Sequence, residues 1–441
     1  MSSTAYDQLN TLLKSFESQH LSSPEKCASY SNADKRRLYS DLEISILDWE
    51  VTHGLELFDL SKTADSDEVC KSLTTQVADL RNLLKLSPIK RGHRWWYWLD
   101  IAFRFVGVQL TIVTISIYCA LPIIMLQPVE DFLRIDIFHR LSVALRRACV
   151  SLILLTSCIT TDYIDMKNEF FAGSNCSILT FFHSSNLDGF FVNVGVPIRH
   201  YGMGKKELFY VPFFSWISFA VGGIPVDRES RKRAINSLHR ASEAAKDNKA
   251  VIAIAPEGTR SKSGNLQPFK KGTFHEQQQM QAPIIPFIIY GAWDLYPVGS
   301  WVNQCGHCVV KALPPIHTQQ EVTERNGTTK TVNLTPSEML RLTRRKMLLA
   351  LRETPLDAGK DLSYTQWIIC YLANCSMFVA FYGFWLIYSH VAFTWLALDS
   401  MEALGYTVAL VIAITVWLYL HFVYIADWWY EFTHSDKSKQ H

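Results

Sequence analysis

Long apolar runs lie near both ends of the polar middle part of the chain. Residues 105–126 contain no Asp, Glu, Lys or Arg, and they are long enough to cross a hydrocarbon core of about 30 Å as a helix. Two further uncharged runs, 367–398 and 406–426, flank a short acidic connection and predict a helical hairpin. A fourth run, 148–161, is shorter than the roughly 17 residues of a usual span. It fits either an embedded pair with the first run or a core helix, and we favour the pair.

Basic and aromatic residues beside these runs predict their orientation. The connection 399–405 has acidic residues and no basic ones. Because basic connections tend to stay in the cytoplasm, we expect the N-terminus, the middle part and the C-terminus there, and only residues 399–405 opposite. The sequons at Asn175, Asn326 and Asn333 would then stay unglycosylated. The flanking residues are Lys90, Arg91, Arg94 and Arg104, the aromatic residues 95–98, and Lys437 and Lys439.

The first 90 residues show apolar positions at helical spacing, and they predict short amphipathic helices. Such helices can dock on the rest of the chain, on a partner or on the bilayer, and we favour ordinary helix packing. The apolar positions are Leu9, Leu12, Leu13 and Phe16, and then Val69, Leu73, Val77, Leu80 and Leu84.

Residues 165–355 change to short β-rich runs that alternate with turns and helical stretches. We expect strands at 177–182, 250–255, 283–289 and 308–313, and a surface helix at 231–246. A capping box at 335–338 predicts another helix to about residue 353. This alternation predicts an α/β fold with a mixed, mostly parallel sheet covered by helices and flanked by membrane helices. The expected division is a helical extension at 1–94, a membrane-embedded helical pair at 95–164, a central domain at 165–358, a transmembrane hairpin at 359–430 and a polar tail at 431–441.

Composition and charge exclude several classes of protein. The 43 Lys and Arg residues nearly balance 41 Asp and Glu residues, so we expect no nucleic-acid partner, because binding to phosphates needs a basic excess. Hydrophobic residues at 49% and aromatic residues at 13% exclude wholesale disorder. Ten cysteines are too sparse for a disulfide scaffold. No basic start followed by an apolar core opens the chain, so we expect no cleaved signal peptide.

The strand predicted at 177–182 leads into a histidine and an aspartate that could act as a pair. Four residues separate His183 from Asp188, which on one continuous helix would place them about 140° apart. They can therefore meet only if His183 lies in the turn and Asp188 in the first helical turn, with Ser184 or Ser185 as the N-cap. A carboxylate-held imidazole is a base that can deprotonate an alcohol near pH 7. Taken alone, such a pair is more often a helix cap and a surface group.

The strand predicted at 250–255 leads into a loop with the residue types that bind an oxyanion. Glycine and a hydroxyl group leave room for the anion, and a guanidinium group binds phosphate oxygens as a fork. The alternative is an ordinary polar turn. The loop residues are Glu257, Gly258, Thr259 and Arg260, and further basic residues are Arg228, Lys270 and Lys271.

Taken together, in this order and at these separations, the blocks resemble the glycerolipid acyltransferase family, above all the 1-acylglycerol-3-phosphate acyltransferases. The resemblance covers roughly residues 165–355. One residue departs from the family pattern, because asparagine often precedes the histidine and Phe182 stands here. The blocks are 183–188, 205–208 leading to 222–228, 257–260, 282–286 and 313–316.

The resemblance implies a one-step transfer. His183 would take the proton from the free hydroxyl of lysophosphatidic acid or a related lysophospholipid, whose oxygen attacks the thioester of acyl-CoA, and Asp188 would hold His183. Arg260, with Glu257, Gly258 and Thr259, would form the acceptor site, and Arg228 would add a second positive contact. No metal or cofactor is implied, with acyl-CoA as co-substrate. From the topology and the chemistry we expect an integral membrane protein of the endoplasmic reticulum whose catalytic domain faces the cytoplasm.

Several alternatives remain open on the sequence alone. Within enzymes they are acylation of glycerol 3-phosphate and of other lysophospholipids. A non-catalytic lipid-binding relative would be expected to lose residues such as His183, which is intact. Cys305 and Cys308 spell a dithiol motif of thiol oxidoreductases, but in the wrong context, directly before a predicted strand. A zinc site from these cysteines and His307 lacks a fourth ligand. The apolar stretch 208–221 is either a buried helix or a surface dipping into the bilayer.

Overall fold

The computed structural model describes residues 2–21, 24–53, 68–87, 97–125, 136–166, 176–323, 329–355, 357–396 and 400–419. Several sequence features lie outside these residues. They are the basic positions 90–94, the aromatic positions 95 and 96, the sequons at Asn175 and Asn326, the end of the last apolar run, and the tail with Lys437 and Lys439.

A mixed sheet of seven strands forms the centre of the described structure, in the order β1-β7-β6-β2-β5-β3-β4. The five strands from β6 to β4 are parallel, whereas β7 is antiparallel to β6 and parallel to β1. This confirms the predicted mixed, mostly parallel sheet. The strands are β1 (Ile159–Ile164), β2 (Ser177–Phe181), β3 (His200–Lys205), β4 (Gly223–Val226), β5 (Val251–Ile254), β6 (Ile284–Tyr290) and β7 (Gly306–Ala312).

Four of these strands, β2, β5, β6 and β7, are the predicted ones, whereas β1, β3 and β4 are additional. The sheet therefore includes residues before 165, the expected start of the central domain. The apolar run 148–161 is divided between helix α8 (Asp136–Thr156) and β1, so it is not one continuous element. Two glycines in β3 and a proline in the edge strand β4 weaken the usual strand pattern.

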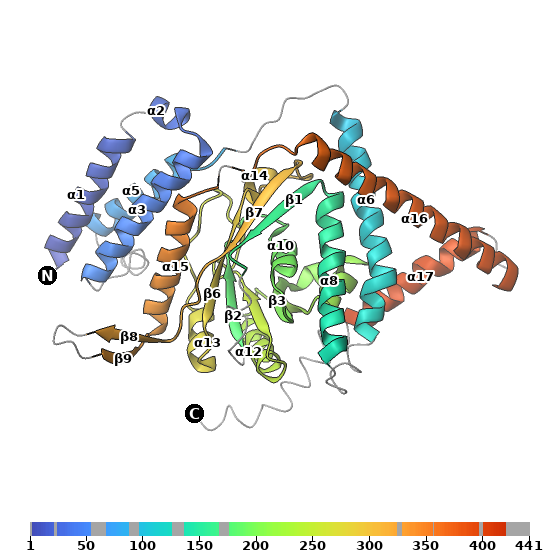
Figure 1. The fold of residues 1–441 in the computed structure, drawn as a ribbon. Coiled ribbons are helices and arrows are strands. Elements are labelled where there is room, and N and C mark those ends of the chain that lie inside the picture. Colours follow the sequence, from blue (N-terminus) through green and yellow to red (C-terminus); the bar gives the residue numbers. More distant parts are fainter. Residues whose placement is uncertain are drawn as a thin grey trace.

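Helices cover both faces of the sheet (Figure 1). One face packs on α8, α10 (Asp188–Gly195) and α14 (Ala292–Leu295). The other packs on α12 (Arg231–Asp247), α13 (Gly272–Met280) and α15 (Pro336–Arg352). The helices predicted at 231–246 and from residue 335 are confirmed, and α15 begins with the predicted capping box of Thr335 and Glu338. A separate hairpin pairs β8 (Gln319–Thr323) with β9 (Thr329–Asn333).

The N-terminal helices form a further layer outside α15 (Figure 1). They are α1 (Ser2–His20), α2 (Pro24–Ser29), α3 (Asn32–His53) and α5 (Glu68–Leu83). Leu9, Leu13 and Val77 are buried in one cluster with Met347 and Leu351 of α15. Of the three alternatives left open for these helices, the structure therefore shows docking on the rest of the chain.

A buried group of charges joins this layer to the central domain. The Glu43 carboxylate of α3 is fully buried, and it accepts from the guanidinium groups of Arg81 in α5, at 2.5 and 3.0 Å, and Arg344 in α15, at 2.5 Å. Burial would raise the pKa of Glu43, but the two arginines lower it to about 2. The carboxylate is therefore ionised and paired near neutral pH.

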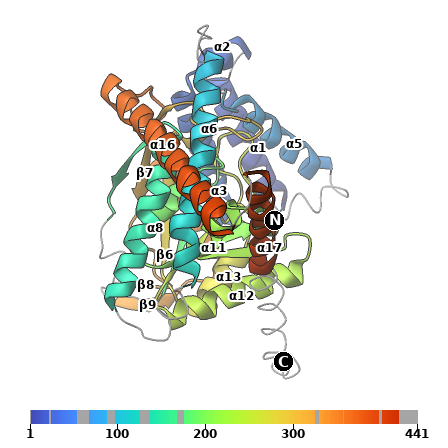
Figure 2. The same cartoon turned by 90° about the vertical axis from the view of Figure 1, so that its right-hand side faces the viewer.

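Apolar helices cover the opposite side of the molecule. Figure 2 views this side and shows α6 (Tyr97–Ile115), α8, α16 (Tyr364–Leu396) and α17 (Ser400–Tyr419) in front of the sheet. Within the described residues, the segments Trp98–Met125 and Tyr364–Tyr388 are long and apolar enough to cross a membrane. Only 33% and 11% of their most apolar windows are buried. Most residues of these windows are therefore not buried, unlike those of core helices.

The apolar helices α6 and α16 run in the same direction. Tyr371 of α16 donates to Asp100 near the start of α6, and Phe384 meets Tyr118 in the π-helical turn (Ser116–Ala120) that follows α6, with ring centroids 5.6 Å apart. Both helices therefore begin on the same side of the molecule. α8 also lies against α6 and α16, and it packs on α10 of the central domain as well.

The apolar stretch 208–221 divides into two parts with different surroundings. The short helix α11 (Phe214–Ala220) packs with Ile123 and Ile153 of the α6 and α8 segments, and it buries Trp216 there. By contrast, Leu208 and Val211 before it are almost half exposed. The first part thus presents apolar side chains on the surface, while the second is a buried helix.

Candidate active site

The polar blocks meet at one edge of the sheet. His183 follows β2, the 257–260 loop follows β5, and Arg228 follows β4. These strands lie in the order β2-β5-β3-β4 and are parallel, so their carboxyl ends share an edge, where α/β proteins commonly bind ligands.

A hydrogen bond of 2.9 Å joins His183 Nδ1 to Asp188 Oδ2. The same oxygen accepts from the backbone N–H groups of Ser184, at 2.7 Å, and Ser185, at 2.8 Å. Asp188 is fully buried, whereas the His183 side chain is 19% exposed. Asp188 Oδ2 already accepts from two N–H groups, so it also acts as the acceptor toward the imidazole ring. Nδ1 is therefore the ring nitrogen that carries the proton. Nε2 of the neutral ring is therefore the nitrogen that can accept a proton.

The turn between these two residues differs from the predicted one in its cap. His183 lies in the turn and Asp188 in the first helical turn, as expected. The prediction that Ser184 or Ser185 is the N-cap is wrong, because Leu187 holds that position without a side-chain cap bond. The Asp188 carboxylate itself closes the turn by binding the two serine N–H groups. Ser185 Oγ instead donates to the Tyr296 carbonyl at 3.1 Å.

Glu257 points into the protein rather than toward the acceptor surface. It is only 3% exposed, and its two oxygens accept from the backbone N–H groups of His183, at 2.7 Å, and Gln267, at 2.9 Å. Burial raises the pKa of Glu257 well above its ordinary value, against the two N–H groups, which lower it. Since Ser261 N also donates to the His183 carbonyl at 2.7 Å, the 257–267 loop binds both backbone groups of His183.

The lack of a side chain at Gly258 leaves room for the side chain of Lys270 to pass over the loop. The φ of Gly258 is +73°, and a Cβ there would lie 2.7 Å from both Cε and Nζ of Lys270. A side chain at this position would therefore strain the backbone and displace the flexible end of the Lys270 side chain. Thr259, beside Gly258, is exposed. The Lys270 ammonium group therefore lies close to the backbone of the 257–260 loop.

Two arginines lie at the open side of this edge. Arg260 donates to Asn186 Oδ1, which fixes it beside the histidine turn. Partial burial lowers the pKa of Arg228, and the positive charge of Arg260 also contributes to the lowering, against Glu207, which raises it. The positive charges of Arg228 and Arg260 therefore influence each other. With Lys270 they form a positive surface that suits a phosphate group.

Two contacts of the site could not be read from the sequence. Asn186 and Gln267 hold functional side chains but lie in no distinctive pattern, and only the position of Asn186 within the 183–188 block was a signal. Phe182 is 3% exposed and packs in the apolar cluster shared with the N-terminal helices. Its position before the histidine is thus occupied by a core residue, and no polar side chain acts from there.

The cysteine motif does not resemble a redox site. Cys308 lies within β7 and not at a helix N-terminus, and it is fully buried. Burial raises the pKa of the Cys308 thiol well above its ordinary value, so it is a poor thiolate. His307 faces Thr160, with 2.9 Å between Nδ1 and Oγ1. Among the described residues, no three His, Cys, Asp or Glu side chains are arranged to hold a metal ion, so the alternative zinc site gains no support.

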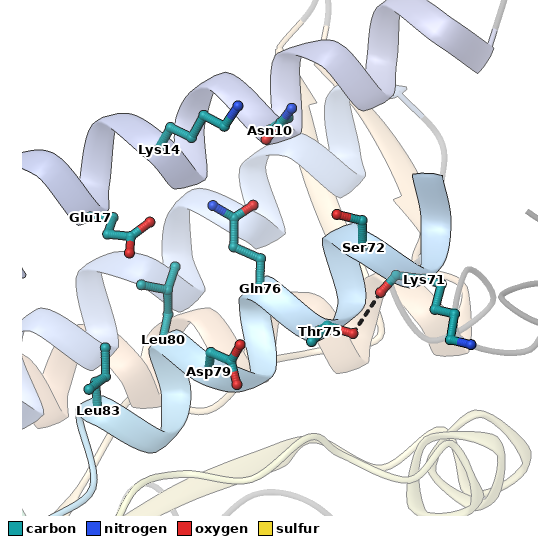
Figure 3. Close-up of a pocket in the computed structure, with 10 residues that line it drawn as sticks. All are labelled: Asn10, Lys14, Glu17, Lys71, Ser72, Thr75, Gln76, Asp79, Leu80 and Leu83. Atoms are coloured by element: carbon teal, nitrogen blue, oxygen red, sulfur yellow. Dashed lines mark hydrogen bonds between the residues drawn. The ribbon is translucent and has the colours of Figure 1, made fainter. Parts of the chain in front are cut away.

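A separate groove of about 610 Å³ lies between α1 and α5 (Figure 3). Figure 3 shows polar side chains such as Lys14, Glu17 and Asp79 along it. None of its residues belongs to the blocks at the sheet edge, so this groove is not part of the candidate active site.

Comparisons with known proteins agree on the central part of the chain. Residues 164–290 match the family described as Acyltransferase. The 1-acyl-sn-glycerol-3-phosphate acyltransferase of Saccharomyces cerevisiae is 36% identical over 33% of this chain and 48% of its own length. The corresponding alpha protein of Homo sapiens is 29% identical over 40% and 58%.

A crystal structure of the 1-acyl-sn-glycerophosphate (LPA) acyltransferase PlsC from Thermotoga maritima aligns with 57% of this chain and 95% of its own, at 19% identity and a TM-score of 0.41. The chain spans about half the length of the curated relatives that it matches. The N-terminal helices lie before the first residue matched by the family.

Proposed function

The central part of the chain belongs to the acyltransferase family, and on this premise we propose that the protein transfers an acyl chain from acyl-CoA to the free hydroxyl of lysophosphatidic acid, giving phosphatidic acid. One observation carries the proposal. A histidine whose Nδ1 is held by a buried aspartate, which leaves Nε2 free to accept a proton, lies at the same sheet edge as Arg260 and Arg228. A base and a phosphate-binding surface are the two features that this acceptor requires.

The reaction needs one proton transfer in each direction. His183 Nε2 takes the proton from the acceptor hydroxyl, while its oxygen forms a bond to the thioester carbonyl carbon. When the carbon–sulfur bond breaks, the coenzyme A sulfur leaves and takes the proton back from His183. Asp188 stabilises the imidazolium that exists between these steps. Arg260, Arg228 and Lys270 bind the phosphate of the acceptor.

The apolar helices support a location at a membrane. α6 and α16 begin on the same side of the molecule, so both can enter a bilayer from the same side. We therefore propose that they hold the domain on the cytoplasmic face of the endoplasmic reticulum, with the N- and C-termini on that face. The exposed apolar residues Leu208 and Val211 would then face lipid beside the acyltransferase domain.

The first experiment compares membranes that contain the protein with membranes that contain the His183→Ala variant. We expect the wild type to esterify lysophosphatidic acid with acyl-CoA and the variant to show no activity at an unchanged protein level. His275→Ala, which changes an exposed histidine of α13, is the matched control and should stay active. Activity retained in His183→Ala would overturn the mechanism.

The acceptor site is tested with Arg260→Lys. A lysine replaces the planar fork by a point charge, so the KM for the acceptor should rise while kcat changes less. Arg345→Lys, at an arginine that pairs with Asp48 of α3, is the control. Glycerol 3-phosphate and other lysophospholipids are the alternative acceptors, and a panel of acceptors assayed with the same membranes discriminates among them.

A further inference from the structure

The N-terminal helices hydrogen-bond the loop that continues the 257–260 block. Tyr39 Oη of α3 donates to the Leu266 carbonyl at 2.9 Å, and Asn265 Nδ2 donates to the Leu84 carbonyl at 2.9 Å. Leu86 N donates to the Ser263 carbonyl at 3.0 Å. Tyr39, Asn265 and Leu266 are buried, so water does not replace these bonds easily.

This loop leads directly to the reacting groups. Gln267, the residue after Leu266, donates its backbone N–H to Glu257, whose other oxygen holds the backbone N–H of His183. Ser261, at the other end of the loop, donates to the His183 carbonyl. A displacement of Leu266 would therefore reach both the histidine turn and the loop that carries Arg260.

The start of α3 holds a second segment beside the site. Arg36 and Asn32 donate to the two carboxylate oxygens of Asp294 in α14, at 2.5 and 3.1 Å. Two residues later, the Tyr296 carbonyl accepts from Ser185 Oγ, next to the Asp188 turn. One helix thus contacts segments on both sides of the histidine turn.

We propose that α3 is a positioning element of the transfer site, in which Tyr39 and Arg36 fix the loops that carry Arg260 and His183. Neither residue touches the substrates. The proposal rests on the proposed acyltransferase function and assigns a role in it to residues before the family match, which begins at residue 164. A purely stabilising layer would only need to bury apolar surface, whereas these bonds end on the loops of the site.

The test uses Tyr39→Phe in the full-length protein, in membranes. This change removes one hydroxyl group and leaves the Leu266 carbonyl without its donor. We expect the KM for lysophosphatidic acid to rise about fivefold, the factor that corresponds to one buried hydrogen bond, because the loop that carries Arg260 is held less firmly.

Tyr30→Phe is the matched control for this variant. Its hydroxyl donates to the His20 carbonyl at 2.9 Å, so it removes the same kind of bond within the N-terminal helices, away from the loop. A role in stability alone would lower the unfolding temperature and leave the KM unchanged. Asn265→Ala, which breaks the bond to Leu84 from the loop side, should raise the acceptor KM as Tyr39→Phe does.

The outcomes separate this inference from the function on which it rests. If wild-type membranes do not acylate lysophosphatidic acid, the proposed function fails. If they do, and Tyr39→Phe and Asn265→Ala keep the acceptor KM of Tyr30→Phe, only the positioning role is overturned. The same conclusion follows if neither Tyr39→Phe nor Asn265→Ala accumulates as folded protein, because the contacts between the N-terminal helices and the loop would then serve folding.

Discussion

Replacing Glu257 by glutamine tests whether this carboxylate holds the histidine turn or contacts the acceptor. In the structure its two oxygens accept from two backbone N–H groups, those of His183 and Gln267. A glutamine can accept through Oε1 only, so its own N–H₂ group would face one of these donors. One buried N–H group would therefore lose its partner in a side chain of unchanged size.

The expected magnitude follows from this lost partner. A buried donor left unsatisfied costs about 1–3 kcal/mol. If the loss falls on the histidine turn and raises the barrier by that amount, kcat falls roughly 5- to 150-fold, since about 1.4 kcal/mol is a factor of ten. The KM for the acceptor should change little, because Glu257 is only 3% exposed and does not face the acceptor surface.

The assay measures kcat and both KM values in membranes that contain equal amounts of protein. Glu276→Gln is the control, because Glu276 is also buried and pairs with His239, at 2.9 Å, outside the site. A raised acceptor KM with an unchanged kcat would show that Glu257 contacts the acceptor after all. If Glu257→Gln has the same kcat and KM values as Glu276→Gln, the idea that Glu257 holds the histidine turn is refuted.

The pH dependence of stability gives an independent readout of the same carboxyl group. Burial raises the pKa of Glu257 well above its ordinary value, so folding favours its protonated form. Its contribution to stability is therefore fully present below the pKa of the unfolded chain and is lost as the pH rises through the raised pKa. Thermal unfolding of the glutamine variant should lack this loss, because the amide does not titrate.

Two further changes test the loop and the N-terminal layer. Gly258→Ala should lower kcat/KM roughly 5- to 150-fold, because the residue would be held at a φ of +73°, a strain of about 1–3 kcal/mol; Gly272→Ala, where a Cβ meets nothing within 4 Å, should stay active. Glu43→Gln should lower the free energy of unfolding by about 3–5 kcal/mol, because it leaves the buried Arg344 and the partly buried Arg81 without their counter-charge. In the wild type, the stability from Glu43 should be present above pH 4.5 and disappear toward pH 2, since its pKa is about 2 against an ordinary 4.5. Denaturation at a series of pH values measures both effects. If Glu43→Gln loses stability on acidification to the same extent as the wild type, the predicted pH dependence of Glu43 is contradicted.

The sequence predicted those parts of the fold whose signal is local. The runs that form β2, β5, β6 and β7 are continuous and apolar, and they end in recognisable blocks. The strands β3 and β4 were not predicted, because glycine and proline are poor strand formers and only their neighbours in the sheet hold them extended. The pairing of His183 with Asp188 could be proposed from spacing, but its cap could not.

Contacts between distant segments could not be predicted. The helix α3 buries charged residues such as Arg36 and Glu43 beside its apolar stripe, and the pattern of apolar positions does not indicate that these charges are buried. Their partners lie in α14, α5 and α15, and nothing local identifies them. The direction of the Glu257 side chain is a similar case. The residue type suggested a substrate contact, whereas the packing of the loop turns it toward the His183 backbone.

The bond between Glu43 and Arg344 joins residues that are 301 positions apart. At about 5–20 residues per second, a ribosome needs roughly 15–60 s to make the chain between them. The N-terminal helices are therefore synthesised first, but they can complete their docking only after α15 has emerged. During that interval Leu9, Leu13 and Val77, which pack with Met347 and Leu351 in the finished protein, lack part of their apolar cover. A nascent chain of this protein should consequently depend on chaperones most strongly at its N-terminal end.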